Sequence, residues 1–521
     1  MRCVINPQSG RGQVMGGRRE IEMIVKGGHL LTMNAREPEY PDGAVAIDAT
    51  RIIAAGSRTE IEARFVARNY LDATGCVMMP GLVDAYAHAG HGMIRGLFHP
   101  ESAWPSHLYW TATTPGWWQA DAELAALERL YAGVTTGQSV IGATPARADD
   151  TIYSDVTAKA YAEAGLRFVL GIGPPDPIFP HLPEPFTANR LVNGELQPHR
   201  FTAEDAVERS VEVIQRWHGA ADGRITAALA VPYLLGRHVL HKRIPNRVPH
   251  SSDAPIMLAH AEAMTALARE HRVAIHTHMF AGGIDFARKH FGQSKLDDIL
   301  SACRIVIAHA NGLPETDVEA LARHRESIGI ATVAFTHENL WYGFAPIPAF
   351  RGRGIPVAIT TDGAAPYTSH DLWREPARTA WNQWQGAGTQ SVLPPETLLG
   401  MVTIEAARVL GLADEIGSIE AGKKADLLVV NLTAPHFGGI HDLAQSLVLY
   451  ANSSDVRDVV VDGQCLMRDR VPLRVNPAFI VNRARREAEA AMQRADLSPY
   501  RRPGGWNAPT DWPKPSVQPR P

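Results

Sequence analysis

Histidine and aspartate residues stand at the ends of several apolar segments of this chain. The first segment, residues 82–88, ends in Tyr86-Ala-His88 and also contains Asp84. Because side chains alternate between the two faces of a strand, these three polar groups should point to the same side. Burying them costs free energy unless a metal ion or a pocket engages them, although a hydrogen-bonded core histidine is the simpler alternative.

Three later apolar segments repeat this pattern. They end in His276-Thr-His278, in His309, and in Thr361 followed by Asp362. Imidazole nitrogens and a carboxylate oxygen are ligands that Zn²⁺ and similar divalent ions accept. A single histidine at a strand end is more often structural, but four such ends together predict a metal site.

The segments that carry these residues belong to a regular alternation of strands and helices. The strand candidates are 82–88, 133–140, 166–172, 225–231, 273–278, 305–309, 330–335 and 355–361, and the helical patterns are 120–131, 154–164, 203–218, 259–271 and 315–324. This order predicts an α/β fold with a (β/α)8 TIM barrel, whose active site lies at the carboxyl ends of the strands. A doubly wound open sheet is the alternative, but no GxGxxG motif opens a helix after a strand.

Short strand patterns precede and follow the barrel. Turn signals at 48–50 and at Asp462-Gly463 predict two hairpins, one on each side of it. We expect both chain ends to contribute to one composite β-sandwich domain. The predicted parts are a flexible lead (1–20), the β-sandwich (21–80 and 413–475), the catalytic barrel (81–412), and a helix with a proline-rich arm (476–521).

The composition excludes several classes of function. With 51 Lys and Arg against 55 Asp and Glu, the net charge of -4 lacks the basic character of a nucleic-acid-binding protein. The four cysteines are scattered, so they form neither a disulfide framework nor a CxxC metal site. No apolar run approaches the roughly 18 residues of a membrane span, and the N-terminal stretch lacks an apolar signal core. We expect a cytoplasmic protein that acts on a small molecule, without a nucleic-acid or membrane partner.

Five motifs occur in a characteristic order. They are Pro80-Gly-Leu-Val-Asp84 with His88 and Arg95-Gly96, then His276-Thr-His278, Ala308-His309, Thr361-Asp362-Gly363, and GSIEAGKKAD at 417–426. Together they resemble the amidohydrolase superfamily, in the branch of guanine and cytosine deaminases and s-triazine hydrolases such as atrazine chlorohydrolase. The resemblance extends over about residues 24–469. It implies the barrel with its composite β-sandwich, one divalent metal ion that activates water, and a homodimer or higher homo-oligomer. Zinc is the expected ion, with iron, manganese or cobalt as alternatives.

The resemblance assigns roles to individual residues. The expected metal ligands are Tyr86, His88, His276, His278, His309 and Asp362. Asp362 would ligate the metal or accept the proton of the attacking water. His309 would help to hold the metal or polarise the bond under attack. Between the two histidines of the fifth strand, His278 is the better ligand candidate and His276 the deeper, supporting one.

The chain departs from the family pattern in its first metal motif. The family has His-x-His where this chain has Tyr86-Ala-His88, although the interval from His88 to Arg95 matches the family. A tyrosine ligates only as phenolate, and its free pKa is about 10. Three alternatives stay open: the metal has one ligand fewer, His91 takes the place, or no catalytic metal binds.

A proton-carrying glutamate of the family's deaminases is also missing. It lies three residues after the fifth-strand histidine, which is Ala281 counted from His278 and Met279 counted from His276. Behind the seventh strand the chain instead has His337 and Glu338, which could replace it, or could be a solvated loop pair. A leaving amine needs a proton, and the candidate donors are Asp362, His337 and Glu338.

The walls of the pocket suggest a ring-containing substrate. Trp110, Trp117 and Phe280 are expected to bind it, and Arg95 could meet an anionic group. Alternatively, the tryptophans pack the loop or a subunit interface, and Arg95 braces the loop. The predicted function is metal-dependent hydrolysis of a C–N bond of amine, amide, urea or carbamate type in a small molecule. A lyase or decarboxylase on the same fold, and a non-catalytic binding or assembly relative, are the alternatives.

Overall fold

The barrel is a parallel sheet that closes on itself. The computed structural model describes residues 14–15, 17–97, 107–142, 147–177, 185–236, 249–334, 343–364 and 369–495. The barrel strands are β7 (Leu82–Asp84), β8 (Ala87–His88), β9 (Val134–Val140), β10 (Arg167–Ile172), β13 (Ile225–Ala230), β14 (Ala274–Met279), β15 (Ile305–His309), β16 (Ile328–Thr332), β17 (Val357–Ile359) and β18 (Asp362–Gly363). Their order is β17-β16-β15-β14-β13-β10-β9-β8-β18, with β7 paired to β9. β17 and β18 follow one another in the eighth segment of the barrel. β17 pairs with β16 and β18 pairs with β8, so this segment joins the two edges of the sheet. The predicted barrel is confirmed.

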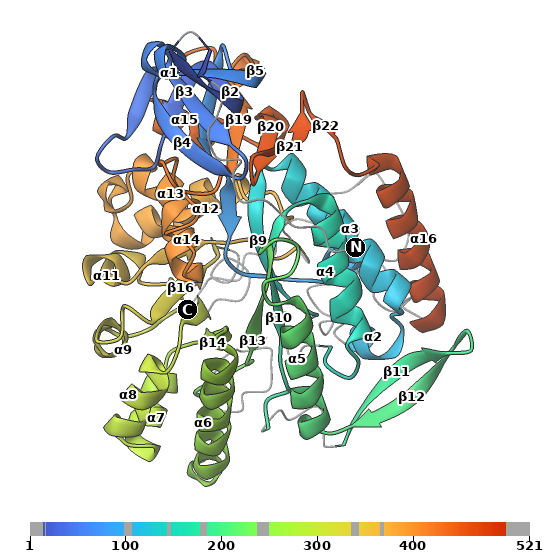
Figure 1. Ribbon diagram of the computed structural model, residues 1–521. Coiled ribbons are helices and arrows are strands. Elements are labelled where there is room, and N and C mark those ends of the chain that lie inside the picture. Colours follow the sequence, from blue (N-terminus) through green and yellow to red (C-terminus); the bar gives the residue numbers. More distant parts are fainter. Residues whose placement is uncertain are drawn as a thin grey trace, which may run out of the picture.

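Helices lie on the outside of the barrel (Figure 1). They are α2 (His107–Thr111), α3 (Pro115–Tyr131), α4 (Ile152–Ala164), α5 (Ala203–Trp217), α6 (Ala254–His271), α7 (Gly283–His290), α8 (Gln293–Ser301), α9 (Glu315–Ala322), α11 (Ile347–Gly352), α12 (Arg374–Ala387), α13 (Pro395–Met401), α14 (Ile404–Leu410), α15 (Leu443–Tyr450) and α16 (Pro477–Ala495). α5 illustrates why they form. Thr202 and Asp205 make a capping box at its start, and the apolar side chains Ala206, Val213 and Ile214 face the barrel.

Both ends of the chain build a second sheet. Its strands are β1 (Val14–Met15), β2 (Arg18–Leu31), β3 (Glu39–Asp48), β4 (Arg51–Ser57), β5 (Phe65–Asp72), β6 (Cys76–Pro80), β19 (Leu427–Asn431), β20 (Val456–Val461), β21 (Gln464–Arg468) and β22 (Val471–Pro472), with helix α1 (Arg58–Arg64) beside β3 and β4. The order β22-β21-β20-β19-β6-β2-β3-β4 joins early and late strands through the antiparallel pair β6 and β19. Blue and orange strands accordingly lie side by side in Figure 1. The predicted composite β domain is confirmed.

The β domain contacts the amino ends of the barrel strands. Arg167 opens β10, and its guanidinium pairs with Asp426 and Asp462 of the β domain at 3.1 Å each. All three side chains are buried. The backbone N–H of Gly81, just before β7, donates to the Asp426 carbonyl. Since the strands are parallel, their carboxyl ends lie at the far end of the barrel, away from these contacts.

Some predicted bounds were wrong. Residues 1–20 do not form a lead throughout, because β2 begins at Arg18. The seventh strand begins at Ile328 rather than at 330, and residue 335 lies outside the described residues. The hairpin of β11 (Phe186–Val192) and β12 (Glu195–Phe201) was not predicted, because its strands are mostly polar and exposed. Its Asn193-Gly194 turn, with positive φ at both residues, was the available signal.

In the part of the chain that the structure describes, no helix has both the length and the apolar character that crossing a membrane requires.

Candidate active site

Five of the predicted metal-site residues gather at the carboxyl ends of the barrel strands. They are Tyr86 between β7 and β8, His88 at the end of β8, His278 near the end of β14, His309 at the end of β15, and Asp362 at the start of β18. The ring of Tyr86 lies 5.4 Å from that of His88, 5.5 Å from that of His278 and 6.3 Å from that of His309, between centroids. Strand register brings Asp362 beside Ala87, the neighbour of His88.

Backbone carbonyls fix two of the imidazole rings. Nδ1 of His88 lies 2.8 Å from the Gly142 carbonyl oxygen, and Nδ1 of His278 lies 3.1 Å from that of Pro232. Because a carbonyl only accepts, each Nδ1 donates, and Nε2 of the neutral ring is left as an acceptor. Metal-binding histidines are commonly oriented in this way.

Each of these two Nε2 atoms faces a potential proton donor. Nε2 of His88 is 3.4 Å from Oδ1 of Asp362, and Nε2 of His278 is 3.0 Å from the hydroxyl of Tyr86. Since Nε2 of neutral His278 can only accept, the tyrosine hydroxyl donates in this pair. The site therefore contains two pairs, Tyr86–His278 and His88–Asp362. In each pair, Nε2 of the histidine carries no proton and can accept a hydrogen bond.

Burial controls the charge of these groups. It lowers the pKa of His88 to about 4 and, together with the neighbouring His88, lowers the pKa of His309 to about 3. Burial, followed by the charges of Asp84 and Glu375, raises the pKa of Asp362 to about 7. At neutral pH these rings are therefore uncharged, and Asp362 can both hold and release a proton.

The backbone is strained at two residues of the cluster. His309 has φ of 71° and Asp362 has φ of 54°, values in the left-handed region that non-glycine residues rarely adopt. Such strain costs on the order of 1–3 kcal/mol per residue and persists only where the surroundings enforce it. A Cβ on Gly363 would lie 1.7 Å from Nδ1 of His91. The ring of His91 in turn stacks on His88 at 5.0 Å.

Asp84 supports the site from beneath instead of joining it. The strand is interrupted between β7 and β8, so Asp84 does not share a face with Tyr86 and His88 as expected. Its carboxylate accepts from the N–H of Thr361 at 3.0 Å, from the Thr361 hydroxyl at 2.7 Å and from Arg129 at 2.9 Å. Arg129, fully buried on α3, was missed in the sequence, where a lone arginine in an apolar helix face was the signal. The ion pair of Asp84 and Arg129 thus holds Thr361, the residue before Asp362, in place.

His276 lies deeper in the barrel than His278. Its ring is 6.4 Å from that of Tyr86, and neither ring nitrogen has a hydrogen-bond partner among the described residues. Burial lowers its pKa to about 3. His276 is thus close to the cluster but makes none of its hydrogen bonds.

The expected substrate-binding residues are mostly engaged elsewhere. Arg95 forms a two-pronged ion pair with Glu128 and donates to the Ala364 carbonyl, so it braces the loop. Trp110 stacks on Phe201, and Trp117 packs against Tyr109 and Trp118 (ring centroids 6.0 and 5.2 Å). Phe280 alone stacks on a cluster residue, His309, at 5.5 Å.

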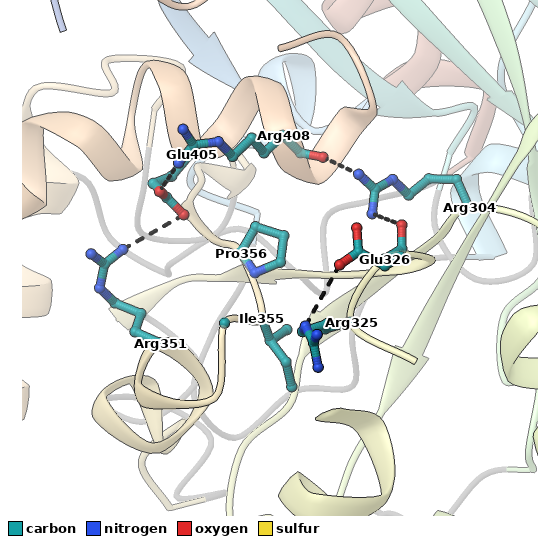
Figure 2. Close-up of a pocket in the computed structure, with 9 residues that line it drawn as sticks. Arg304, Arg325, Glu326, Arg351, Ile355, Pro356, Glu405 and Arg408 are labelled. Atoms are coloured by element: carbon teal, nitrogen blue, oxygen red, sulfur yellow. Dashed lines mark hydrogen bonds and ion pairs between the residues drawn. The ribbon is translucent and has the colours of Figure 1, made fainter. Parts of the chain in front are cut away.

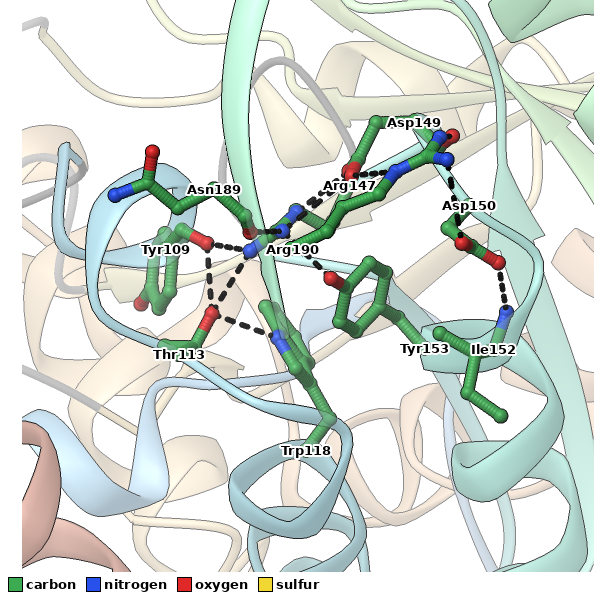
Figure 3. Close-up of polar contacts among 10 residues, drawn as sticks. All are labelled: Tyr109, Thr113, Trp118, Arg147, Asp149, Asp150, Ile152, Tyr153, Asn189 and Arg190. Atoms are coloured by element: carbon green, nitrogen blue, oxygen red, sulfur yellow. Dashed lines mark hydrogen bonds and ion pairs between the residues drawn. The ribbon is translucent and has the colours of Figure 1, made fainter. Parts of the chain in front are cut away.

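A buried arginine explains why the first loop is packed. Figure 3 shows Arg147, after β9, donating to the Tyr109 carbonyl, to the Thr113 hydroxyl at 2.9 Å and to the Asn189 carbonyl of β11 at 2.6 Å. It also pairs with Asp149 and has no exposed side-chain area. These bonds tie the first loop, the second loop and the β11–β12 hairpin together, so the tryptophans belong to a loop core. His337 and Glu338 lie outside the described residues.

The donor types of the cluster fit a divalent metal ion. His88 and His278 present Nε2 atoms, Asp362 presents carboxyl oxygens, and Nδ1 of His309 is buried without a hydrogen-bond partner in the described part of the chain. As placed, the described residues contain no group of three His, Cys, Asp or Glu side chains that could hold an ion. Tyr86 accounts for part of this, because its hydroxyl engages Nε2 of His278. Ion binding would have to open that hydrogen bond.

Comparison with known proteins decides the family. Residues 77–466 match the model of the Amidohydrolase family. The chain belongs to the amidohydrolase family. It is 30% identical, over 465 residues, to a 5-methylthioadenosine/S-adenosylhomocysteine deaminase of Desulforudis audaxviator, covering 87% of this chain and 95% of that protein. It is 28% identical to a 5'-deoxyadenosine deaminase of Methanosarcina acetivorans, covering 91% of this chain and 99% of that protein. The predicted family is confirmed, and with it the class of hydrolases acting on C–N bonds other than peptide bonds.

Solved structures of this amidohydrolase's relatives share its fold. An adenosine deaminase from Xanthomonas campestris with bound zinc superposes with a TM-score of 0.75 at 21% identity, covering 91% of this chain and all of that one. Atrazine chlorohydrolase from Arthrobacter aurescens, complexed with zinc, gives 0.72 at 21% identity, covering 89% and 100%.

Proposed function

We propose that this amidohydrolase uses a divalent metal ion, zinc in the first place, to hydrolyse a C–N bond of a small ring-containing molecule. One observation carries the proposal. The buried carboxyl of Asp362, whose pKa is raised to about 7, faces the bare Nε2 of His88 at 3.4 Å among neutral imidazoles at the catalytic end of the barrel. A perturbed carboxyl beside ligand-type side chains is typical of a hydrolytic centre.

His88, His278, His309 and Asp362 are the residues that would hold the ion. When bound there, the ion would supply a water molecule with a pKa lowered toward neutrality. Asp362 would accept the proton of this water and return it to the leaving group. His309, stacked on Phe280, would face the polarised bond of the substrate.

The missing glutamate shapes the choice of substrate. The position three residues after His278 is Ala281, in the turn before α7, and the nearest carboxylate on that helix, Asp285, has a side chain that is 60% exposed. A single described carboxyl, Asp362, must therefore serve both proton transfers. The deaminase relatives make the exocyclic amine of an adenosine-type ring the first bond to test. Ring amides, ureas and carbamates come next, because they do not require protonation of a ring nitrogen.

The test begins with the metal. Chelator-treated protein is reloaded with Zn²⁺, and its metal content is measured by mass spectrometry, for wild type, for His88→Ala and for His271→Ala at the end of α6 as a control. Ammonia release from adenosine-type nucleosides and ring amides is then assayed. We expect bound zinc and turnover in wild type and control, with turnover at least about a hundredfold lower in His88→Ala.

The outcomes separate the parts of the proposal. Wild-type protein that binds no divalent ion would overturn the metal-dependent mechanism. Bound zinc without turnover of either substrate group would favour a binding role. We also propose a homodimer or higher homo-oligomer, which analytical ultracentrifugation of the same samples would test.

A further inference from the structure

A cavity lies at the end of the barrel opposite the candidate active site. It has a volume of about 380 Å³ and is lined by residues that directly precede β15, β16 and β17 and by residues of α11 and α14. Because these residues stand at the amino ends of parallel strands, the cavity faces away from His88 and Asp362. Its volume is in the range of small-molecule sites.

The lining of this cavity is strongly cationic. It contains four arginines, Arg304, Arg325, Arg351 and Arg408, against two glutamates, Glu326 and Glu405. Arg351 and Arg408 share Glu405 (Figure 2). Arg325 is 3.6 Å from Glu326, but both side chains are more than half exposed, so this pair contributes little. The cavity therefore carries an excess of two positive charges.

Arg304 holds its charge in a fixed position without a counter-ion. Its guanidinium donates to the backbone carbonyls of Arg408 at 2.5 Å, Glu326 at 3.2 Å and Ile328 at 3.4 Å. Among the described residues, no carboxylate lies within ion-pair distance of it. Burial lowers its pKa, and the charge of the nearby Glu326 offsets this only in part. The carbonyls orient the group, so little conformational entropy is lost when an anion binds.

We propose that this cavity binds a phosphate-bearing small molecule, with Arg304 and Arg325 as the groups that recognise the phosphate. A phosphate ester carries about -1.5 to -2 charges at pH 7, which matches the excess positive charge of the lining. Guanidinium groups bind phosphate oxygens in a two-pronged manner. The cavity is also lined by Pro356, whose apolar ring suits an organic body attached to the phosphate.

The experiment uses ribose 5-phosphate as the probe and ribose as its uncharged counterpart, in calorimetric titrations of the full chain. Arg325→Gln removes a lining charge from a side chain that is 56% exposed and pairs with Glu326. Arg323→Gln is the matched control: it is two residues away, equally charged, and its side chain is 52% exposed against 56% for Arg325, but it does not line the cavity.

We expect saturable binding of ribose 5-phosphate but not of ribose. Affinity should fall at least about tenfold in Arg325→Gln and stay within about twofold in Arg323→Gln, because a charge-assisted hydrogen bond is lost only in the first. Absence of binding, equal weakening in both variants, or equal binding of ribose would overturn the proposal. Binding lost in His88→Ala but kept in Arg325→Gln would place the anion at the catalytic end and would overturn it as well. None of these readouts depends on the reaction that the enzyme catalyses.

Discussion

Tyr86→Phe tests what the tyrosine at the first metal position does. The substitution removes one hydroxyl from a side chain that is 1% exposed and leaves the rest of the ring in place. The lost hydroxyl donates to Nε2 of His278, 3.0 Å away. In the ion-free protein the half-buried pair would then lose this hydrogen bond, and a hydrogen bond of this kind contributes about 0.5–1.5 kcal/mol. We expect Tyr86→Phe to lower the free energy of unfolding by that amount when the metal has been removed.

The metal content should respond differently. Burial, followed by the charge of Asp362, raises the pKa of Tyr86 well above 10, so a phenolate is strongly disfavoured at this position. If Tyr86 is not a ligand, zinc content per chain stays the same in Tyr86→Phe. The affinity should even rise modestly, since Nε2 of His278 no longer has to lose a hydrogen bond.

Urea unfolding of chelated protein and mass spectrometry of zinc-loaded protein supply the two readouts. Tyr109→Phe is the matched control, because its hydroxyl is buried without a hydrogen-bond partner in the described residues, so its removal should not lower the free energy of unfolding. Loss of zinc from a stably folded Tyr86→Phe protein would refute this reasoning and make the phenolate a ligand. Unchanged stability would refute the claimed hydrogen bond.

Three further predictions concern the supports of the site and of the fold. Gly363→Ala should displace His91, whose Nδ1 would lie 1.7 Å from the new Cβ, and reduce turnover at least about tenfold; Gly352→Ala, with open space around it, should be neutral in the same assay. Arg167→Met should lower the free energy of unfolding by about 3–5 kcal/mol, because the buried Asp426 loses its cation, while Asp462 keeps Lys424 and Arg224. Arg68→Met at the surface should change the urea midpoint far less. Burial lowers the pKa of His260 to about 4, so the folded state resists its protonation, and stability present above pH 6.5 should fall by up to about 3 kcal/mol as the pH drops from 6.5 to 4. His260→Gln should flatten this pH dependence of the urea midpoint, and an unchanged slope would contradict the assignment.

The strand ends could be predicted from the sequence because two local signals agree there. β15 was predicted with its observed bounds, since an apolar run stops at His309 and a helix follows. The rule that parallel strands present their carboxyl ends together then brought His88, His278, His309 and Asp362 to one place. Placing these four residues at one end of the barrel needed no long-range information beyond the alternation of strands and helices.

The loops could not be predicted in this way. A tryptophan or arginine has the same local pattern whether it lines a pocket or packs a loop, and the difference depends on distant partners. Trp110 stacks on Phe201, which is 91 positions away in the sequence, and Arg95 pairs with Glu128, which is 33 positions away. Arg147 holds the first loop in its packed position through hydrogen bonds, and its partners Tyr109, Tyr153 and Asn189 come from three separate segments.

The two departures from the family pattern have a common consequence for the ion-free site. The hydroxyl of Tyr86 donates to Nε2 of His278, and the carboxyl of Asp362, when protonated, can donate to Nε2 of His88. Each of these two nitrogens therefore faces a proton donor from a neighbouring side chain. If these residues bind an ion as proposed, uptake would displace both protons from these nitrogens, and ligation by Asp362 would release one of them to solvent. Since the pKa of Asp362 is raised to about 7 in the ion-free protein, uptake should strengthen as the pH rises through neutrality. With Tyr86 and Ala281 at these two positions, Asp362 is the described group that would couple metal binding to proton transfer in the proposed mechanism.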